Sequence, residues 1–217
     1  NKKLKHINND KFIYEKLDVT DEICIRHVFD KYKPDYFINF AAKSSVVDSW
    51  KHPKLTFQTN AMAVINILEI IRYVKPSCRF YSAGSSEEFG EIETTPQTLE
   101  HPLKPRSPYG ASKCAARHIV KVYRDSYNLF AIHCILFNHE SILRGKQFVT
   151  RKITSNLAYI KYKIEKQESF DCFELGNIDA RRDWSYSNDF MEAIWIMLNQ
   201  DKPDEYILSS NKDYSIK

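Results

Sequence analysis

Glycine is scarce in this sequence. Five of its 217 residues are glycine, and the first of them is Gly84, whereas glycine makes up about 7% of an average protein. The turn that cradles a phosphate at the start of a helix needs glycine, because the backbone must approach the phosphate closely. The chain before Gly84 has no residue suited to such a turn, and it begins with Asn1 rather than Met. We therefore expect a further segment before Asn1.

Long apolar runs, a secretory pattern and paired cysteines are also missing. No run approaches the roughly 20 apolar residues that span a bilayer, and residues 1–9 are basic and polar rather than signal-like. The five cysteines are an odd number without a C-x-x-C pair, which favours reduced thiols over disulfides or a zinc site. We expect no membrane association, no metal and a cytoplasmic location.

A strong excess of one charge is absent as well. The 32 Lys and Arg residues against 28 Asp and Glu residues give a formal charge of +4, and the basic residues are scattered among acidic ones. This pattern argues against nucleic acid as a partner, whereas a cleft that receives phosphates accounts for the same mild excess. The chain is long enough to bury a substantial core in one large domain, or in one domain plus an appendage.

The sequence does contain alternating strand-like and helix-like segments. Strands separated by crossovers of this length imply a parallel, doubly wound α/β sheet of the Rossmann type. Ligands of such sheets bind beyond the carboxyl ends of the strands, so the positions of interest follow Asp18, Phe40, Ala83 and Phe137. Strands are predicted at 12–19, 36–40, 79–83, 132–137, 172–175 and 206–208, and helices at 21–32, 55–74, 108–127, 150–162 and 188–198.

Tyr109 and Lys113 lie four residues apart on a predicted helix and therefore share a face. An ammonium beside a phenol favours the phenolate and lowers its pKa from about 10. A phenolate can take a proton from a hydroxyl group while hydride leaves the same carbon. The spacing recurs twice in a later helix that follows no strand-end serine, and there we expect solvated surface: Tyr159/Lys163 and Tyr162/Lys166.

The predicted strand 79–83 runs into Gly84-Ser85-Ser86-Glu87-Glu88-Phe89-Gly90. Hydroxyl groups at this strand end can hydrogen-bond a substrate oxygen, and a carboxylate two residues further on can act as an acid or base. The alternative is a glycine-bounded turn with solvated acids. The Tyr–Lys helix that follows at this distance favours a site.

These two segments, 79–90 and 105–113, resemble the extended short-chain dehydrogenase/reductase family, and within it the GDP-mannose 4,6-dehydratases. The Asn-His-Glu-Ser block at 138–141 and the Arg-Asp-Trp block at 182–184 favour this group over its relatives. Further resembling blocks cover nearly the whole chain in family order: 17–21, 39–46, 135–141, 148–153 and 175–184.

The resemblance implies four catalytic residues. Tyr109 would be the base for oxidation at carbon 4 of a sugar, and Lys113 would hold the nicotinamide ribose. Ser85, where the family usually has threonine, would hydrogen-bond the carbon-4 oxygen. Glu87 would move the carbon-5 proton and assist loss of the carbon-6 hydroxyl. Hydride would then return to carbon 6, so NADP would be a tightly held, recycled cofactor, with NAD as the alternative.

The resemblance also implies binding residues and a division of the chain. Residues 1–140 would bind the dinucleotide, and residues 141–217 would form a nucleotide-sugar-binding part interleaved with them. Segments 55–74 and 108–127 resemble helices that pair across a two-fold axis, which implies a homodimer or homotetramer. The cofactor would contact Asp18, Val19, Ala41, Ala42, Ser44, Asn60, Tyr109 and Lys113, and the nucleotide sugar would contact Ser85, Asn138, Arg144, Val149, Lys152 and Arg182.

Some positions depart from the family pattern. Residues 141–145 read Ser-Ile-Leu-Arg-Gly in place of Ser-Pro-Arg-Arg-Gly, and 185–186 read Ser-Tyr in place of Gly-His. One alternative is a dehydratase of dTDP- or UDP-glucose, although those enzymes usually carry Asp-Glu where Ser86-Glu87 stands here. Another is a non-catalytic nucleotide-sugar-binding protein, against which the intact set of four catalytic residues argues.

Overall fold

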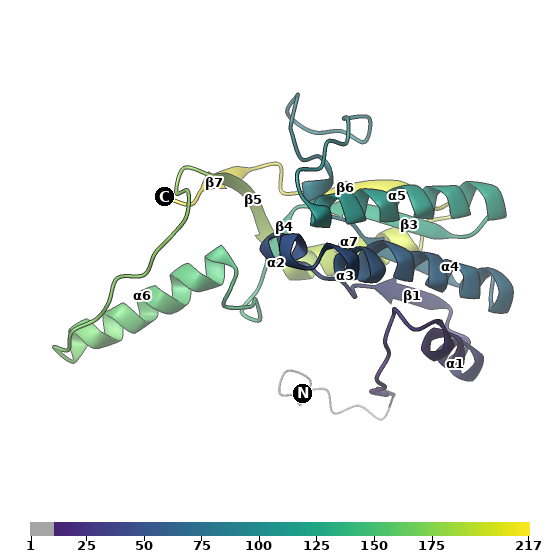
Figure 1. Cartoon of the computed structure of the whole chain (residues 1–217), viewed down its shortest axis with the longest axis horizontal. Coiled ribbons are helices and arrows are strands. Elements are labelled where there is room, and N and C mark those ends of the chain that lie inside the picture. Colours follow the sequence, from purple (N-terminus) through teal and green to yellow (C-terminus); the bar gives the residue numbers. More distant parts are fainter. Residues whose placement is uncertain (1–10) are drawn as a thin grey trace.

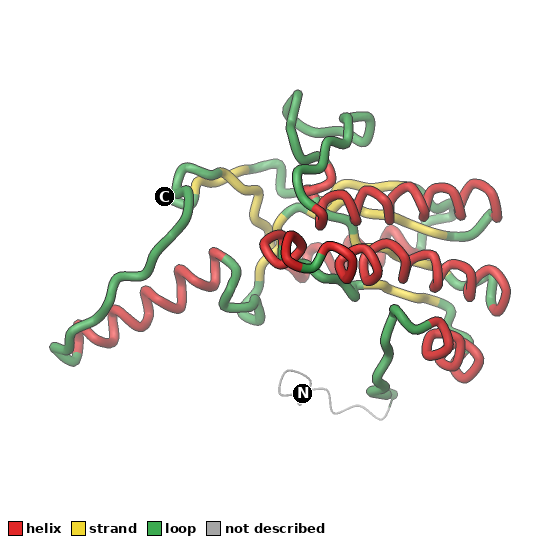
Figure 2. Tube along the Cα trace, viewed as in Figure 1, coloured by secondary structure: helices red, strands yellow, loops and turns green. Residues whose placement is uncertain are grey.

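The computed structural model describes residues 11–217, so the polar segment 1–9 lies outside the described residues. Its centre is a four-stranded sheet in the order β1-β2-β3-β6, and every neighbouring pair is parallel (Figures 1 and 2). All six residues of β3 are buried, as expected for a strand that is covered on both faces. The strands are β1 (Tyr36–Asn39), β2 (Arg79–Ala83), β3 (Ala131–Leu136) and β6 (Glu205–Leu208).

Helices cover both faces of this sheet. Phe80 of β2 packs in one core and its neighbour Tyr81 in the other, because successive side chains of a strand point to opposite faces. This is the doubly wound arrangement that the sequence predicts. The first core is shared with α1 (Glu22–Tyr32), α4 (Ala63–Val74) and α5 (Pro108–Tyr127), and the second with α7 (Ser187–Leu198).

The helix ends follow from local side-chain chemistry. The Asp21 carboxylate accepts hydrogen bonds from two backbone amides of the first turn of α1, and Ser107 caps α5 directly before a proline. Lys33 and Asn128 end α1 and α5 in the left-handed conformation. The predicted bounds of these helices are confirmed to within one residue.

The predicted helix 55–74 begins earlier and contains an irregular turn. It consists of α3 (Pro53–Phe57), a π-helical turn η1 (Gln58–Met62) and α4. Pro53 starts α3, as expected for proline in a first helical turn. A preceding short helix, α2 (Val46–Lys51), is capped by Ser45 and was not predicted.

A second sheet of three strands, in the order β4-β5-β7, lies beside the first (Figure 1). Its strands are parallel between β4 and β5 and antiparallel between β5 and β7. Helix α6 projects away from both sheets in Figure 1 and has no buried residue. The bounds are β4 (Asn138–Glu140), α6 (Val149–Glu165), β5 (Arg181–Tyr186) and β7 (Asp213–Ser215).

Two predicted strands are wrong. Residues 12–19 are extended chain ending in a turn, and Ile13 and Tyr14 are about two-thirds exposed. Residues 172–175 have no strand partner either, and Cys172 is exposed. A strand forms only where its backbone groups find partners in a neighbouring strand, and local apolar composition does not supply this. Among residues 11–217, no helix combines the length and apolar character that crossing a membrane requires.

Candidate active site

Hydrogen bonds hold the first two residues of the loop after β2, Gly84 and Ser85, in place. The Gly84 amide donates to the Cys134 carbonyl, and Ser85 caps the short 3₁₀ helix η2 (Ser86–Glu88). The Ser85 amide donates to Oε1 of Glu88 at 2.8 Å, while the Ser85 hydroxyl accepts from the Glu87 amide at 3.3 Å. This reciprocal capping fixes the Ser85 hydroxyl at the carboxyl end of β2.

Helix α5 docks onto this loop through Gly110. A Cβ at Gly110 would lie 2.5 Å from the Glu87 carbonyl oxygen, so only glycine permits this approach. The contact brings the first turn of α5, with Tyr109, close enough to Ser85 for the Ser85 side chain to affect the pKa of the Tyr109 hydroxyl. Three of the four predicted catalytic residues, Ser85, Glu87 and Tyr109, are therefore held at one junction of loop and helix.

The pKa of Tyr109 shifts in the direction opposite to the sequence prediction. Burial raises the pKa of the Tyr109 hydroxyl, and the neighbouring Ser85 side chain acts against this shift. The Lys113 ammonium lies 6.0 Å from the centre of the Tyr109 ring and donates to the Ala83 carbonyl at 2.7 Å. The ammonium thus binds the end of β2 rather than the phenol oxygen, which spacing along a helix could not reveal.

Lys113 is itself an unusual lysine. Its side chain is buried, and burial lowers its pKa to about 8, although the charge of Glu88 opposes this shift. A buried ammonium needs hydrogen-bond acceptors to offset its lost hydration. Ribose hydroxyl groups are such acceptors, so the residues at this strand end fit a nicotinamide nucleotide.

Replacing Lys113 with methionine should stabilise the protein when it is free of substrate and cofactor. The pKa of Lys113 is depressed in the folded state, from 10.5 to about 8. Burying the charged ammonium therefore destabilises the folded protein fully below pH 8, and this destabilisation disappears as pH rises to about 10.5. Lys113→Met should therefore be more stable than wild type by up to about 3 kcal/mol at pH 7, and the difference should shrink by pH 10.

Denaturant unfolding at the two pH values measures this effect. Lys121→Met, on the exposed side of the same helix, is the control and should change stability little. A Lys113→Met protein that is less stable than wild type at pH 7 would contradict the burial penalty.

Asn60 organises the predicted cofactor-binding loop. Its side-chain amide donates to the Lys43 carbonyl and to the Ser112 hydroxyl, and its Oδ1 accepts from the Lys43 amide at 2.8 Å. Asn60 lies in the π-helical turn, a type of irregularity often found at functional sites. The segment 41–45, which contains Ala41, Ala42 and Ser44, is therefore tied to α5 directly beside Lys113.

A small cavity of about 340 Å³ lies at the carboxyl end of β1. Val19 and Ala41 line it together with Asn39, whose side chain accepts from the Ala41 amide at 3.1 Å. Asp18 precedes this cavity in a turn in which its carboxylate accepts from the amide and hydroxyl of Thr20. The structure thus places the predicted cofactor residues at the adjacent ends of β1 and β2.

A larger cavity of about 670 Å³ opens beyond the carboxyl ends of β2, β3 and β6. Glu87, Asn138 and Arg182 line this cavity, so the structure brings together three residues that the sequence singles out. The sequence analysis missed several other lining residues, because they depend on pairing of β5 with β7 and on the 91–107 loop: Ile92, Thr95, Gln97, Arg181, Asn211 and Lys212.

Four of the six predicted substrate residues do not line this cavity: Ser85, Arg144, Val149 and Lys152. Arg144 forms an ion pair with Glu140 at 3.1 Å, and Lys152 donates to the Glu174 carbonyl. Val149 begins α6. Because α6 buries none of its residues, its side chains do not reach the two cores or the cavity between the sheets.

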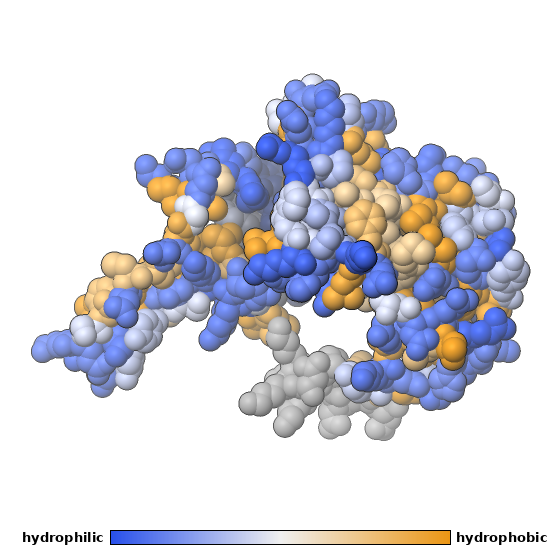
Figure 3. All heavy atoms as spheres, in the orientation of Figure 1, coloured by the Kyte–Doolittle hydropathy of each residue, from blue (hydrophilic) through white to orange (hydrophobic). Residues whose placement is uncertain are grey.

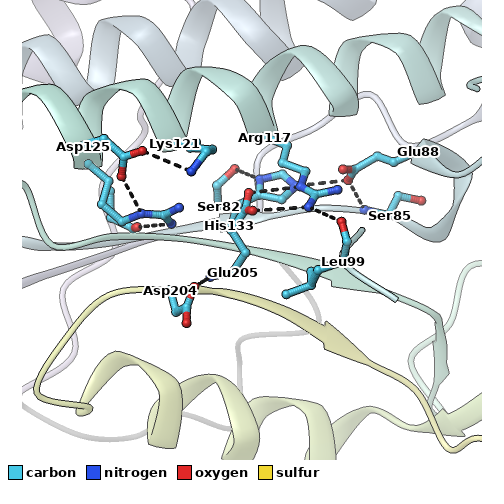
Figure 4. Close-up of polar contacts among 12 residues, drawn as sticks. Ser82, Ser85, Glu88, Leu99, Arg117, Lys121, Asp125, His133, Asp204 and Glu205 are labelled. Atoms are coloured by element: carbon cyan, nitrogen blue, oxygen red, sulfur yellow. Dashed lines mark hydrogen bonds and ion pairs between the residues drawn. The ribbon is translucent and has the colours of Figure 1, made fainter. Parts of the chain in front are cut away.

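The 91–107 loop forms one wall of the larger cavity, and hydrogen bonds of two buried side chains, His101 and Arg117, hold it in place. Nε2 of the buried His101 accepts from the Glu93 amide at 3.1 Å. The Arg117 guanidinium donates to the Leu99 carbonyl and pairs with Glu205 of β6 at 3.0 Å (Figure 4). One arginine on α5 therefore joins the loop to the central sheet.

The other two Tyr-x-x-x-Lys pairs lie on the surface, as predicted. Tyr159 and Tyr162 are each about half exposed on α6. Lys163 pairs with Glu168 rather than with a ligand cavity. Among the described residues, no group of histidine, cysteine and acidic side chains has the arrangement of a metal site.

The fold and the Ser85–Tyr109–Lys113 junction define a Rossmann-type α/β protein of the short-chain dehydrogenase/reductase class. A family model described as GDP-mannose 4,6 dehydratase matches residues 1–217. The chain belongs to this family. It is 40% identical over 214 residues to the GDP-mannose 4,6-dehydratase of Vibrio cholerae, a match that covers 98% of this chain and 56% of that protein.

Solved structures share this fold at low sequence identity. RMD from Pseudomonas aeruginosa complexed with NADPH gives a TM-score of 0.85 at 21% identity, covering 94% of this chain and 68% of that one. The dTDP-glucose 4,6-dehydratase of Bacillus anthracis in complex with NAD gives 0.80 at 20% identity, covering 99% and 63%. The chain spans about half the length of the curated relatives that it matches.

Proposed function

We propose that the complete protein is a lyase that converts GDP-mannose to GDP-4-dehydro-6-deoxymannose by internal hydride transfer through bound NADP. The observation that carries this proposal is that α5, docked on the loop after β2, holds Ser85, Glu87 and Tyr109 at one junction. An alcohol oxidation needs a base at the hydroxyl group, and a β-elimination needs a second base at the neighbouring carbon. The site offers both, one on each side of Ser85.

The residues have separate roles in this reaction. Tyr109 takes the proton from the carbon-4 hydroxyl, and Ser85 donates a hydrogen bond that holds the same oxygen. Glu87 lines the cavity and removes the carbon-5 proton, which the new ketone has made acidic, and the same carboxyl group protonates the carbon-6 hydroxyl so that it leaves as water. NADP, when bound, would accept hydride from carbon 4 and return it to carbon 6. The raised pKa of Tyr109 opposes its deprotonation, so bound ligands must bring that pKa down for oxidation to begin.

The cofactor and the substrate would occupy different parts of the chain. Support for a dinucleotide-binding part in residues 1–140 comes from Asn60, Lys113 and the small cavity at the end of β1. Support for a nucleotide-sugar part in 141–217 comes from Arg182, because arginine binds diphosphates in a bidentate manner. The two parts interleave, since β6 returns to the central sheet after β5. The matched relatives whose names give GDP-mannose, and a structure complexed with NADPH, favour these ligands.

The test is an incubation of the complete protein with GDP-mannose, dTDP-glucose and UDP-glucose. A 4-keto-6-deoxy product from GDP-mannose alone is the expected result. Product from dTDP- or UDP-glucose instead would assign the alternative substrate. Binding without any product would favour a non-catalytic nucleotide-sugar-binding protein. A cytoplasmic location belongs to the same proposal, because nucleotide-sugar precursors and reduced thiols fit that compartment.

We also propose that the complete protein forms a homodimer, alone or within a homotetramer, through α4 and α5. Apolar side chains gather where these helices lie in Figure 3. Tyr73, Val122 and Tyr127 are 70%, 55% and 45% exposed. An isologous contact of the two helices with their symmetry copies would cover these side chains.

Val122→Asp should therefore convert the dimer to a monomer in light scattering at micromolar concentration. Ile196→Asp is the matched control, because Ile196 is equally exposed but lies on α7, which covers the opposite face of the sheet. A wild-type protein that is monomeric under these conditions would rule out the proposed contact.

A further inference from the structure

Three buried polar side chains form a chain directly behind the loop that carries Ser85 (Figure 4). The Ser82 hydroxyl lies 3.3 Å from Nδ1 of His133, and Nε2 of the same ring lies 3.1 Å from Oε1 of Glu88. These side chains come from β2, β3 and η2, and none is more than 2% exposed. Buried polar groups of this kind need a compensating role, because their lost hydration destabilises the fold.

The chain of side chains is packed tightly against the backbone at Gly84. A Cβ at this position would lie 2.5 Å from Nε2 of His133 and 2.6 Å from Oε1 of Glu88. The absence of a side chain at Gly84 therefore allows the carboxylate and the imidazole to meet beneath the loop. A side chain at Gly84 would displace Glu88 or His133, so their contact depends on this glycine.

A Ser-His-carboxylate order is also found in hydrolases, but the geometry excludes such a role here. Ser82 lies within the central strand, and its side chain is 2% exposed. The larger cavity is lined by Ser86 and Glu87 instead. A substrate carbonyl could not reach the Ser82 hydroxyl, so Ser82 does not act as a nucleophile.

Of the three side chains Ser82, His133 and Glu88, it is Glu88 that contacts the loop of the candidate active site. Its Oε1 accepts from the Ser85 amide at 2.8 Å, whereas its buried Oε2 has no hydrogen-bond partner. An incompletely satisfied buried carboxylate is costly, and here it anchors the amide of Ser85, the residue beside Tyr109. Hydrogen bonds join His133 to Glu88 and Glu88 to Ser85.

We propose that the Glu88–His133 pair is a positioning device that holds Ser85 against Tyr109 and places a fixed negative charge behind the Tyr109–Lys113 site. The proposal rests on the dehydratase function proposed above for its kinetic consequences. Its electrostatic consequence can be measured without turnover.

The Glu88 carboxylate affects the pKa values of both Tyr109 and Lys113 on α5. Glu88 raises the pKa of Lys113, which burial lowers to about 8, and it also raises the pKa of Tyr109. Neutralising Glu88 should therefore shift both titrations toward lower pH. The titratable groups that face Glu88 are His133 and Cys134 from β3, and Tyr109, Lys113 and Cys114 from α5.

The first experiment is Glu88→Gln in the complete protein. Glutamine keeps the shape and an amide oxygen that can accept from the Ser85 amide, but it removes the charge. Both hydrogen bonds of Oε1 can be kept, so this variant tests the charge. A roughly tenfold or larger fall in kcat with GDP-mannose is expected for Glu88→Leu/His133→Leu, which removes the anchor of the Ser85 amide, because small displacements in a reacting geometry are costly. KM should change less than about twofold, since neither Glu88 nor His133 lines the cavity. The pH profile of kcat should move to lower pH.

The second measurement follows the Lys113 titration by NMR of isotopically dimethylated lysines, in protein free of ligands, with Lys113→Met to assign the signal. Its midpoint should be lower in Glu88→Gln than in wild type. Glu91→Gln, which removes an exposed acid from the same loop, is the matched control and should change neither the midpoint nor the pH profile.

The outcomes separate this proposal from the proposed function. A wild-type protein without dehydratase activity would refute the function, while the Lys113 titration would still test the charge of Glu88. An active wild type whose pH profile and Lys113 midpoint are unchanged by Glu88→Gln would overturn the role of the Glu88 charge, and an unchanged kcat in Glu88→Leu/His133→Leu would overturn the positioning role. If Glu88→Gln does not fold, Glu88→Leu/His133→Leu removes both partners of the pair and should show the same shift to lower pH. An unshifted profile in that variant would also overturn the proposal.

Discussion

Glu87→Gln should stop the reaction after its first half. The variant should still reduce bound NADP when GDP-mannose is added, because oxidation at carbon 4 depends on Tyr109. It should release little 4-keto-6-deoxy product, since an amide keeps the shape of Glu87 but cannot take the carbon-5 proton. The loss in product formation should be about a hundredfold or more. Absorbance of the reduced cofactor and deuterium incorporation at carbon 5 from heavy water measure the two halves.

Glu91→Gln is again the control, because this exposed acid lies just beyond the site. Product formation by Glu87→Gln at near the wild-type rate would show that Glu87 is not the carbon-5 base. Sequence alone makes Glu88 the nearest substitute. The structure argues against that substitute, because Glu88 is fully buried and bonded to His133, whereas Glu87 lines the cavity.

Tyr109→Phe should abolish turnover at the earlier step. The variant lacks the hydroxyl that takes the carbon-4 proton, so neither bound reduced cofactor nor product should form, with a loss of about 10²- to 10⁴-fold. The phenyl ring keeps the packing of a side chain that is 8% exposed, so the thermal midpoint should change little. Single-turnover absorbance of the cofactor and thermal unfolding measure the two effects.

Tyr159→Phe is the matched control, because Tyr159 has the same spacing to a lysine but lies half exposed on α6. It should leave activity unchanged. Reduction of bound cofactor by Tyr109→Phe at the wild-type rate would remove Tyr109 from the mechanism and leave Ser85 as the remaining hydroxyl at the junction.

The sequence predicts the core of the fold because local patterns and tertiary burial agree there. β3 is a nearly continuous apolar run, and α5 carries both a cap at Ser107 and a left-handed end at Asn128. The prediction fails for short strands whose partners are distant in sequence. β5 begins with two arginines and pairs with β7 about thirty residues later, so its composition gives no strand signal.

In the candidate site, too, residues in short sequence motifs could be predicted, whereas contacts between residues far apart in the sequence could not. Ser85, Glu87, Tyr109 and Lys113 were identified because short motifs carry them. The role of His133 was missed, because a lone histidine in an apolar strand reveals neither its burial nor its partner Glu88. The direction of the Tyr109 pKa shift was wrong for a related reason, since burial is a property of the fold and not of residue spacing.

Helix α5 carries both the proposed catalytic base and the residue that holds the wall of the larger cavity. Tyr109 lies in its first turn, and Arg117, eight residues or about 12 Å further along the axis, clamps the Leu99 carbonyl and Glu205. Any opening of the 91–107 loop that keeps this clamp must hinge on either side of Leu99. An opening of this loop on either side of Leu99 would therefore leave the first turn of α5, with Tyr109, in place.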